Sequence, residues 1–72
     1  MSKIIDSEAL GRVIRRERKR QQVTQVELAA MAGVGVRFLR ELEFGKESCQ
    51  LGRAFVVLNA LGICMEANTR ER

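Results

Sequence analysis

Two arginines near the middle of the chain carry the side chains best suited to a specific chemistry. Arg37 and Arg40 are three residues apart and closely follow Gly33 and Gly35. A guanidinium can donate two parallel hydrogen bonds, either to O6 and N7 of a guanine or to a phosphate. Histidine is absent from the chain, and no cysteine or serine lies beside a suitable general base. The residues therefore indicate a binding protein rather than an enzyme, and we expect no cofactor.

The overall composition supports a small helical domain with an anionic partner. The 72 residues contain 13 Lys and Arg against 9 Asp and Glu, a net charge of +4, which favours polyanions. Hydrophobic residues make up 46%, and Pro, Trp and Tyr are absent, so we predict one all-α domain spanning residues 1–72.

No segment has the length of a membrane span or the pattern of a signal peptide, so we expect a cytoplasmic protein without a membrane partner. Cys49 and Cys64 are isolated, and we interpret them as free thiols rather than metal ligands.

A pair of short helices must hold the two arginines in place. Thr24 can cap a helix over residues 24–32, because its hydroxyl can accept a hydrogen bond from an amide one turn on. Glu27 completes a capping box, and Gly33 can end the helix in the left-handed conformation. Four residues are expected to form its buried face: Leu28, Ala29, Met31 and Ala32.

The second helix of the pair is expected to begin after Gly35 and to end near Phe44. Leu39 and Leu42 have the spacing of residues that face inward, and Ala29 is small where the two helices must cross. A capped helix, a glycine turn and a second helix together form the helix-turn-helix unit, whose second helix enters the DNA major groove.

Two further helices are predicted on either side of this pair. Residues 1–5 form a flexible tail, and Asp6 or Ser7 caps the first helix, with Leu10, Val13 and Ile14 inward. The last helix spans residues 51–61 and ends at Gly62. Its predicted buried face consists of Leu51, Ala54, Phe55, Leu58 and Leu61.

The C-terminal segment 63–72 has two alternatives. One is a short strand that pairs with its copy in a second subunit, with Leu61, Ile63 and Met65 at the dimer interface. The other is a frayed tail.

A basic run at the end of the first helix contains Arg15, Arg16, Arg18, Lys19 and Arg20. For Arg16, Lys19 and Arg20 two interpretations stay open: a solvated helix face, or contact with phosphates. Arg18 differs, because it lies one turn beyond Ile14 on the inward side. A buried lone charge is very costly, so we predict a structural ion pair between Arg18 and Glu43.

At these residues the sequence resembles the Cro/phage-repressor (Xre) family of helix-turn-helix proteins. The shared text is Thr-Gln-x-x-Leu-Ala from Thr24, Ala-Gly-Val from Ala32, and Leu-x-x-Leu-Glu-x-Gly-Lys from Leu39 to Lys46. The segment from Arg37 to Lys46, followed by a Leu-rich helix and a short apolar tail, looks like the HipB-type antitoxins. The resemblance implies a lambda-repressor-like bundle that dimerises, represses its own operon on double-stranded DNA, and binds a HipA-like kinase toxin. Such a protein would be associated with the nucleoid when bound to DNA.

The resemblance and the helix geometry together assign contacts on DNA. Base contacts are expected from four residues: Val36, Arg37, Arg40 and Glu41. Phosphate contacts are expected from six: Thr24, Gln25, Gly35, Phe44, Gly45 and Lys46. For Arg37 the alternative to DNA contact is an intrahelical pair with Glu41.

A second function class is a protein-interaction module that has kept the fold and binds a partner such as a toxin without reading DNA. The apolar tail motivates this alternative, together with Phe38, which does not fit the inward stripe. For Phe38 we expect partial burial.

Overall fold

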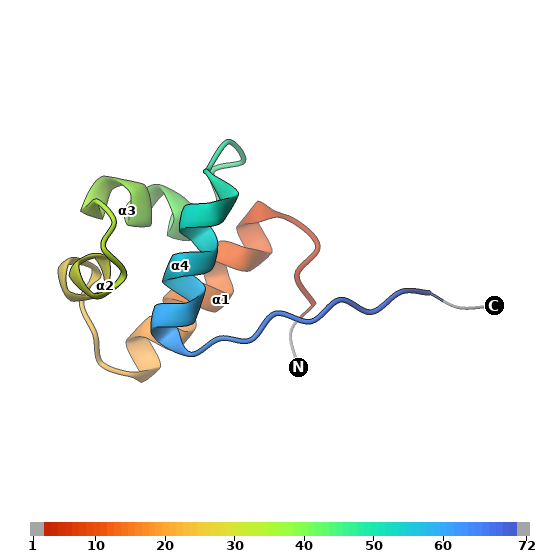
Figure 1. Cartoon of the computed structure of the whole chain (residues 1–72), viewed down its shortest axis with the longest axis horizontal. Helices are drawn as coiled ribbons and strands as arrows, with labels where there is room; N and C mark the ends of the chain where they lie inside the picture. Colours follow the sequence, from red (N-terminus) through yellow and green to blue (C-terminus); the bar gives the residue numbers. More distant parts are fainter. Residues whose placement is uncertain (1–2, 71–72) are drawn as a thin grey trace.

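The four helices of the protein begin and end at residues that the sequence marks. A computed structural model describes residues 3–70; predictions for residues 1–2 and 71–72 lie outside that range. The helices are α1 (Ser7–Arg20), α2 (Gln25–Ala32), α3 (Val36–Phe44) and α4 (Leu51–Leu61), with no strand between residues 3 and 70 (Figure 1). The all-α prediction is therefore confirmed. No helix in this range is long and apolar enough to cross a membrane.

Local capping chemistry sets the helix boundaries. The Asp6 carboxylate accepts a 2.8 Å hydrogen bond from the Ala9 amide at the start of α1. At the start of α2, Thr24 Oγ1 accepts from the Glu27 amide at 3.0 Å, and Glu27 Oε1 accepts from the Thr24 amide at 2.8 Å. The predicted capping box is thus confirmed. Gly33 ends α2 in the left-handed conformation, with φ +73°, which costs glycine little.

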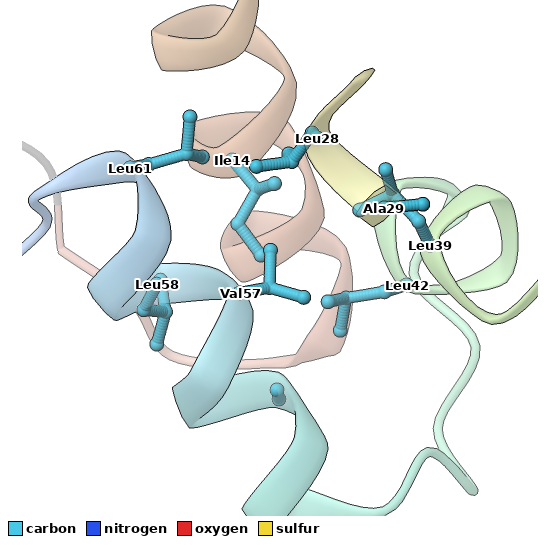
Figure 2. Close-up of a cluster of buried hydrophobic side chains, with 9 residues drawn as sticks. Ile14, Leu28, Ala29, Leu39, Leu42, Val57, Leu58 and Leu61 are labelled. Carbon is cyan, nitrogen blue, oxygen red and sulfur yellow. The ribbon is translucent and has the colours of Figure 1, made fainter. Parts of the chain in front are cut away.

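The core lies between α1 and α4 on one side and the α2–α3 pair on the other (Figures 1 and 2). Its members are Ile14, Leu28, Ala29, Leu39, Leu42, Ala54, Val57, Leu58 and Leu61. The inward positions predicted for Leu39 and Leu42 are confirmed, as is the burial of Ala29 at the helix crossing.

Three predictions of burial were wrong. Met31, Leu51 and Phe55 are exposed, whereas Val57 is fully buried. In α4 the inward stripe is spaced by three and four residues through Ala54, Val57, Leu58 and Leu61. Because α4 is apolar on most of its circumference, its sequence allowed more than one stripe.

Gly11 brings α1 close to α3. It is buried, and a Cβ atom at this position would lie 2.5 Å from the carbonyl oxygen of Glu43 and 2.7 Å from that of Leu42. Only a residue without a side chain allows the two backbones to approach so closely. The position of α3 on the body of the protein therefore depends on a glycine in the middle of α1.

The C-terminal segment leaves the helical body as an extended chain (Figure 1). Ile63 is half-buried against the core, and its amide donates to the Leu58 carbonyl at 2.9 Å. Met65 is 42% exposed. The pairing of this segment with a second subunit stays a prediction.

Candidate nucleic-acid interface

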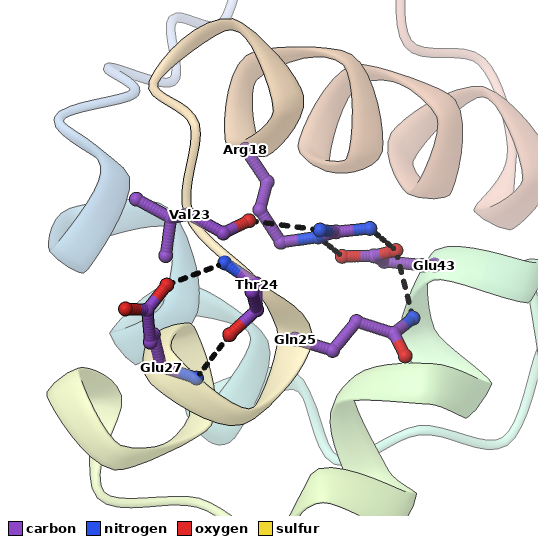
Figure 3. Close-up of polar contacts among 6 residues, drawn as sticks. All are labelled: Arg18, Val23, Thr24, Gln25, Glu27 and Glu43. Carbon is purple, nitrogen blue, oxygen red and sulfur yellow. Dashed lines mark hydrogen bonds and ion pairs between the residues drawn. The ribbon is translucent and has the colours of Figure 1, made fainter.

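A buried ion pair ties the recognition helix α3 to α1. Arg18 Nε lies 2.6 Å from Glu43 Oε2, and Arg18 Nη2 lies 3.0 Å from Oε1 (Figure 3). The two side chains are 9% and 4% exposed. Arg18 Nη1 also donates to the Val23 carbonyl at 2.9 Å. The predicted pairing of Arg18 with Glu43 is confirmed, and it joins α1, α3 and the loop before α2.

Gln25 belongs to the same network. Its Nε2 donates to Glu43 Oε1 at 3.1 Å, so the side chain points from the start of α2 toward the end of α3 (Figure 3). The first turn of α2 also carries the positive end of the helix dipole, where backbone amides lack helical partners. The N-terminus of α2, including Thr24 and Gln25, is thus suited to an anion such as a phosphate.

The outer face of α3 presents Arg37 to solvent. Its side chain is 91% exposed, and Nε lies 3.5 Å from Glu41 Oε2. Lys46 Nζ approaches the other Glu41 oxygen at 3.3 Å, so one carboxylate lies between two cations. Exposed pairs of this kind are worth little, about 0–1 kcal/mol, so Arg37 can exchange Glu41 for another acceptor at small cost. Val36, at the start of the helix, is half-buried against the core.

Arg37 and Arg40 border different recesses beside α3. Arg37 borders a shallow recess with Gly35, Phe38 and Arg53. Arg40 borders two other recesses, one with Arg15 and Lys19 of α1 and one that contains Glu8, Glu41 and Lys46. Both arginines were predicted as base contacts, because Arg40 lies one turn beyond Arg37 on the same helix.

Aromatic side chains at the two ends of α3 behave differently. Phe38 is half-buried as predicted, and Arg53 of α4 lies 5.9 Å from its ring centroid. Phe44, the last residue of α3, is 88% exposed. Gly45 follows with a φ angle of +95° and ends α3 before Lys46. At the C-terminal end of the recognition helix, where phosphate contacts were predicted, Phe44 and Lys46 are exposed, whereas Gly45 between them is half-buried against Glu8 of α1.

The cations in the basic run of α1 differ in the residues that surround them. Arg20 donates to both carboxylate oxygens of Glu17, at 3.0 and 2.5 Å. The hydrogen bonds from Arg20 and then from Gln21 lower the pKa of Glu17 from 4.5 to about 2. The Glu17 contact agrees with a solvated helix face for Arg20, whose side chain is 70% exposed, and the alternative of a phosphate contact stays untested. Lys19 instead lies on the flank that faces α3, together with Arg15, for which no contact was predicted from the sequence.

The predicted dimer residues differ in what they can offer a partner. Leu61 is buried in the core of its own chain, so little of its side chain is available to a second subunit. Ile63 and Met65 keep exposed surface. The outer face of α4 also exposes two apolar residues, Phe55 and Val56.

The geometry of α2 and α3 defines a class of protein. A capped helix, a left-handed glycine and a braced second helix with an exposed arginine form a helix-turn-helix unit. A sequence model with the description "Helix-turn-helix" matches residues 14–64. The chain belongs to this helix-turn-helix family.

Individual relatives agree with that assignment. The chain is 43% identical over 67 residues to an uncharacterised HTH-type transcriptional regulator, y4mF, of Sinorhizobium fredii (strain NBRC 101917 / NGR234), covering 92% of this chain and 88% of that protein. The fold of the present chain is similar to that of HipB in a HipB–O4 20mer complex, with a TM-score of 0.88 at 22% sequence identity. HipB in a HipA–HipB–O2–O3 complex gives the same TM-score and identity. Each similarity covers 99% of this chain and 100% of the HipB chain.

Proposed function

We propose that this protein is a sequence-specific DNA-binding transcriptional regulator. The observation that carries the proposal is Arg37, which is 91% exposed on the recognition helix of a helix-turn-helix family member. A side chain held in this position has the reach and the donor geometry to bind a guanine edge in the major groove. The name of the 43%-identical relative, an HTH-type transcriptional regulator, agrees with this role.

Base readout is assigned to the first half of α3. Arg37 takes guanine O6 and N7, and Val36 touches a thymine methyl group with the part of its side chain that remains exposed. Glu41 accepts from a cytosine amino group or holds Arg37 in position, which its 3.5 Å contact with Arg37 supports. Arg40 was predicted in the same set, and it borders a recess with Arg15 and Lys19 of α1.

Phosphate contacts are assigned to the two ends of the unit. Gln25 offers its backbone amide at the positive end of α2, beside Thr24, whose own amide already donates to Glu27, and Lys46 offers its ammonium group after α3. The remaining members of this set are Gly35, Phe44 and Gly45. Gly35 has no hydroxyl to offer, so it contributes only its backbone.

The assembly that we propose is a homodimer and an autorepressing antitoxin of the HipBA type. The fold similarity to HipB, which has been solved together with HipA, supports a HipA-like kinase toxin as the protein partner. The dimer interface combines Ile63 and Met65 with the exposed Phe55 and Val56 of α4. The protein would act in the cytoplasm and associate with the nucleoid through its operator DNA.

A binding titration on the DNA upstream of its own gene tests this function. Fluorescence anisotropy should give tight binding to that duplex and weaker binding to a scrambled duplex of equal length. Lys46→Ala should weaken both complexes and flatten their salt dependence, because Lys46 is assigned to a phosphate. No preference for the upstream duplex, together with a protein complex that survives high salt, would instead identify an interaction module.

A further inference from the structure

A recess between α1 and α3 gathers cations from two helices. Arg15 and Lys19 project from α1, and Arg40 projects from α3. Arg40 lies at least 21 positions after Arg15 and Lys19 in the sequence. Only the packing of α1 on α3 brings the three side chains to one place. The recess also contains Gln25 and Phe44, so it adjoins the phosphate-binding end of α2 and the C-terminal end of the recognition helix.

The single carboxylate in the recess is already neutralised. Glu43 accepts three hydrogen bonds, two from the Arg18 guanidinium and one from the Gln25 amide. It therefore has little capacity left to compensate Arg15, Lys19 and Arg40. The side chains of these three are exposed and form no hydrogen bond or ion pair with another residue of the described range 3–70.

Other cations on the same surface are differently placed. Arg37 and Lys46 share Glu41, and Arg20 is held by Glu17. Arg40 also borders a recess that contains Glu8 and Glu41, but it forms no ion pair with either of them. Three cations that line one recess without an ion-pair partner among the described residues repel one another and attract a polyanion. Phe44 also borders the recess and is 88% exposed, so its apolar ring is available to the sugar next to a phosphate.

We propose that Arg15, Lys19 and Arg40 form a second phosphate site, which holds the DNA backbone where it passes from the recognition helix toward α1. This inference rests on the proposed DNA-binding function and adds residues to it. It assigns Arg40 to the backbone rather than to base edges, because Arg40 borders the recess shared with Arg15 and Lys19 of α1 and does not border the recess that contains Arg37. The site strengthens binding to any duplex and carries no sequence information of its own.

The test compares two variants with a matched control on the same helix. The variants are Arg15→Gln/Lys19→Gln and Arg40→Gln. The control is Arg12→Gln, because Arg12 is an exposed α1 arginine that borders a different recess, with no residue of α2 or α3. Far-UV circular dichroism melts should show that all of them fold as the wild type does.

Each protein is titrated against the upstream duplex and a scrambled duplex at several salt concentrations. Removing one phosphate interaction lowers the slope of log K against log [salt] by about 0.9, or roughly 2 for a dimer in which both subunits are changed. Arg40→Gln should show such a decrease on both duplexes, and the double variant, which removes two cations, should show about twice as large a decrease, with the ratio of the two affinities unchanged in each variant. Arg12→Gln should retain the wild-type slope.

Several results would overturn the proposal. Wild-type slopes in the double variant, or an equal decrease in Arg12→Gln, would mean that no localised phosphate site exists between α1 and α3. A changed affinity ratio in Arg40→Gln would return Arg40 to the base-reading set. In each of these cases the wild-type protein still prefers its upstream duplex, so the proposed function stands. Absence of any DNA binding by the wild type would overturn both.

Discussion

Removing one partner of the Arg18–Glu43 pair should destabilise the protein strongly. In Arg18→Met, Glu43 would keep only the hydrogen bond from Gln25, although its side chain is 4% exposed. Leaving a buried charge without its partner costs about 3–5 kcal/mol. A domain of 72 residues has a total stability of roughly 4–11 kcal/mol, at about 0.05–0.15 kcal/mol per residue. The single variant should therefore lose a large part of its free energy of unfolding.

The double variant Arg18→Met/Glu43→Leu should recover most of that stability. It removes both charges together and replaces them with apolar side chains, which is often close to neutral for a buried pair. The Val23 carbonyl and the Gln25 amide would each lose one hydrogen bond, but both lie at the edge of the network and can turn to water. A coupling energy of about 2–4 kcal/mol between the two positions is therefore expected.

Urea unfolding followed by far-UV circular dichroism measures this cycle, because the chain has no Trp or Tyr for fluorescence. All variants must be compared at one protein concentration, since dimerisation would contribute to apparent stability. Small single-variant effects that simply add in the double variant would refute the reasoning. They would mean that the pair is solvated in solution and does not fix α3 on α1.

Three other outcomes follow from the same structure. Gly11→Ala should lower the free energy of unfolding in a urea titration by about 1–3 kcal/mol or more, because the new Cβ atom would lie 2.5 Å from a carbonyl oxygen of α3. An unchanged urea midpoint would mean that α1 and α3 separate easily. Glu17 has a pKa lowered to about 2 by the hydrogen bond from Arg20, so protonation favours unfolding. Its contribution should be complete above pH 4.5 and fade as the pH falls toward 2, so the stability advantage of wild type over Glu17→Gln should shrink in that window; a constant difference would contradict this. Phe55→Glu/Val56→Glu should raise the dimer dissociation constant in sedimentation measurements while the monomer stays folded, and unaltered dimerisation would remove the outer face of α4 from the interface.

Local chemistry made much of the fold predictable from the sequence. Thr24 and Glu27 fix the start of α2 because their hydrogen bonds span only three residues. The glycine after each of α2, α3 and α4 adopts a positive φ angle and ends its helix. The Arg18–Glu43 pair was predictable by a different argument, because an arginine on an inward helix position requires a buried carboxylate.

Features that depend on packing could not be predicted in the same way. Gly11 in isolation only weakens a helix, and its role exists only where α3 crosses α1. Val57 was missed because α4 is apolar on several sides, so burial had to be decided by the neighbouring helices. The cationic recess combines Arg15 and Lys19 with Arg40, and no spacing in one helix could reveal a site shared by two.

The central claim is that the helix-turn-helix unit holds Arg37 against the edge of a base pair. Its most direct test is the base preference of wild type and Arg37→Ala, measured by selection from a randomised duplex library around the upstream site. We predict that the variant loses about 1–3 kcal/mol of discrimination at one guanine in each half-site and keeps its preferences elsewhere. An identical base preference in the two proteins would contradict the account.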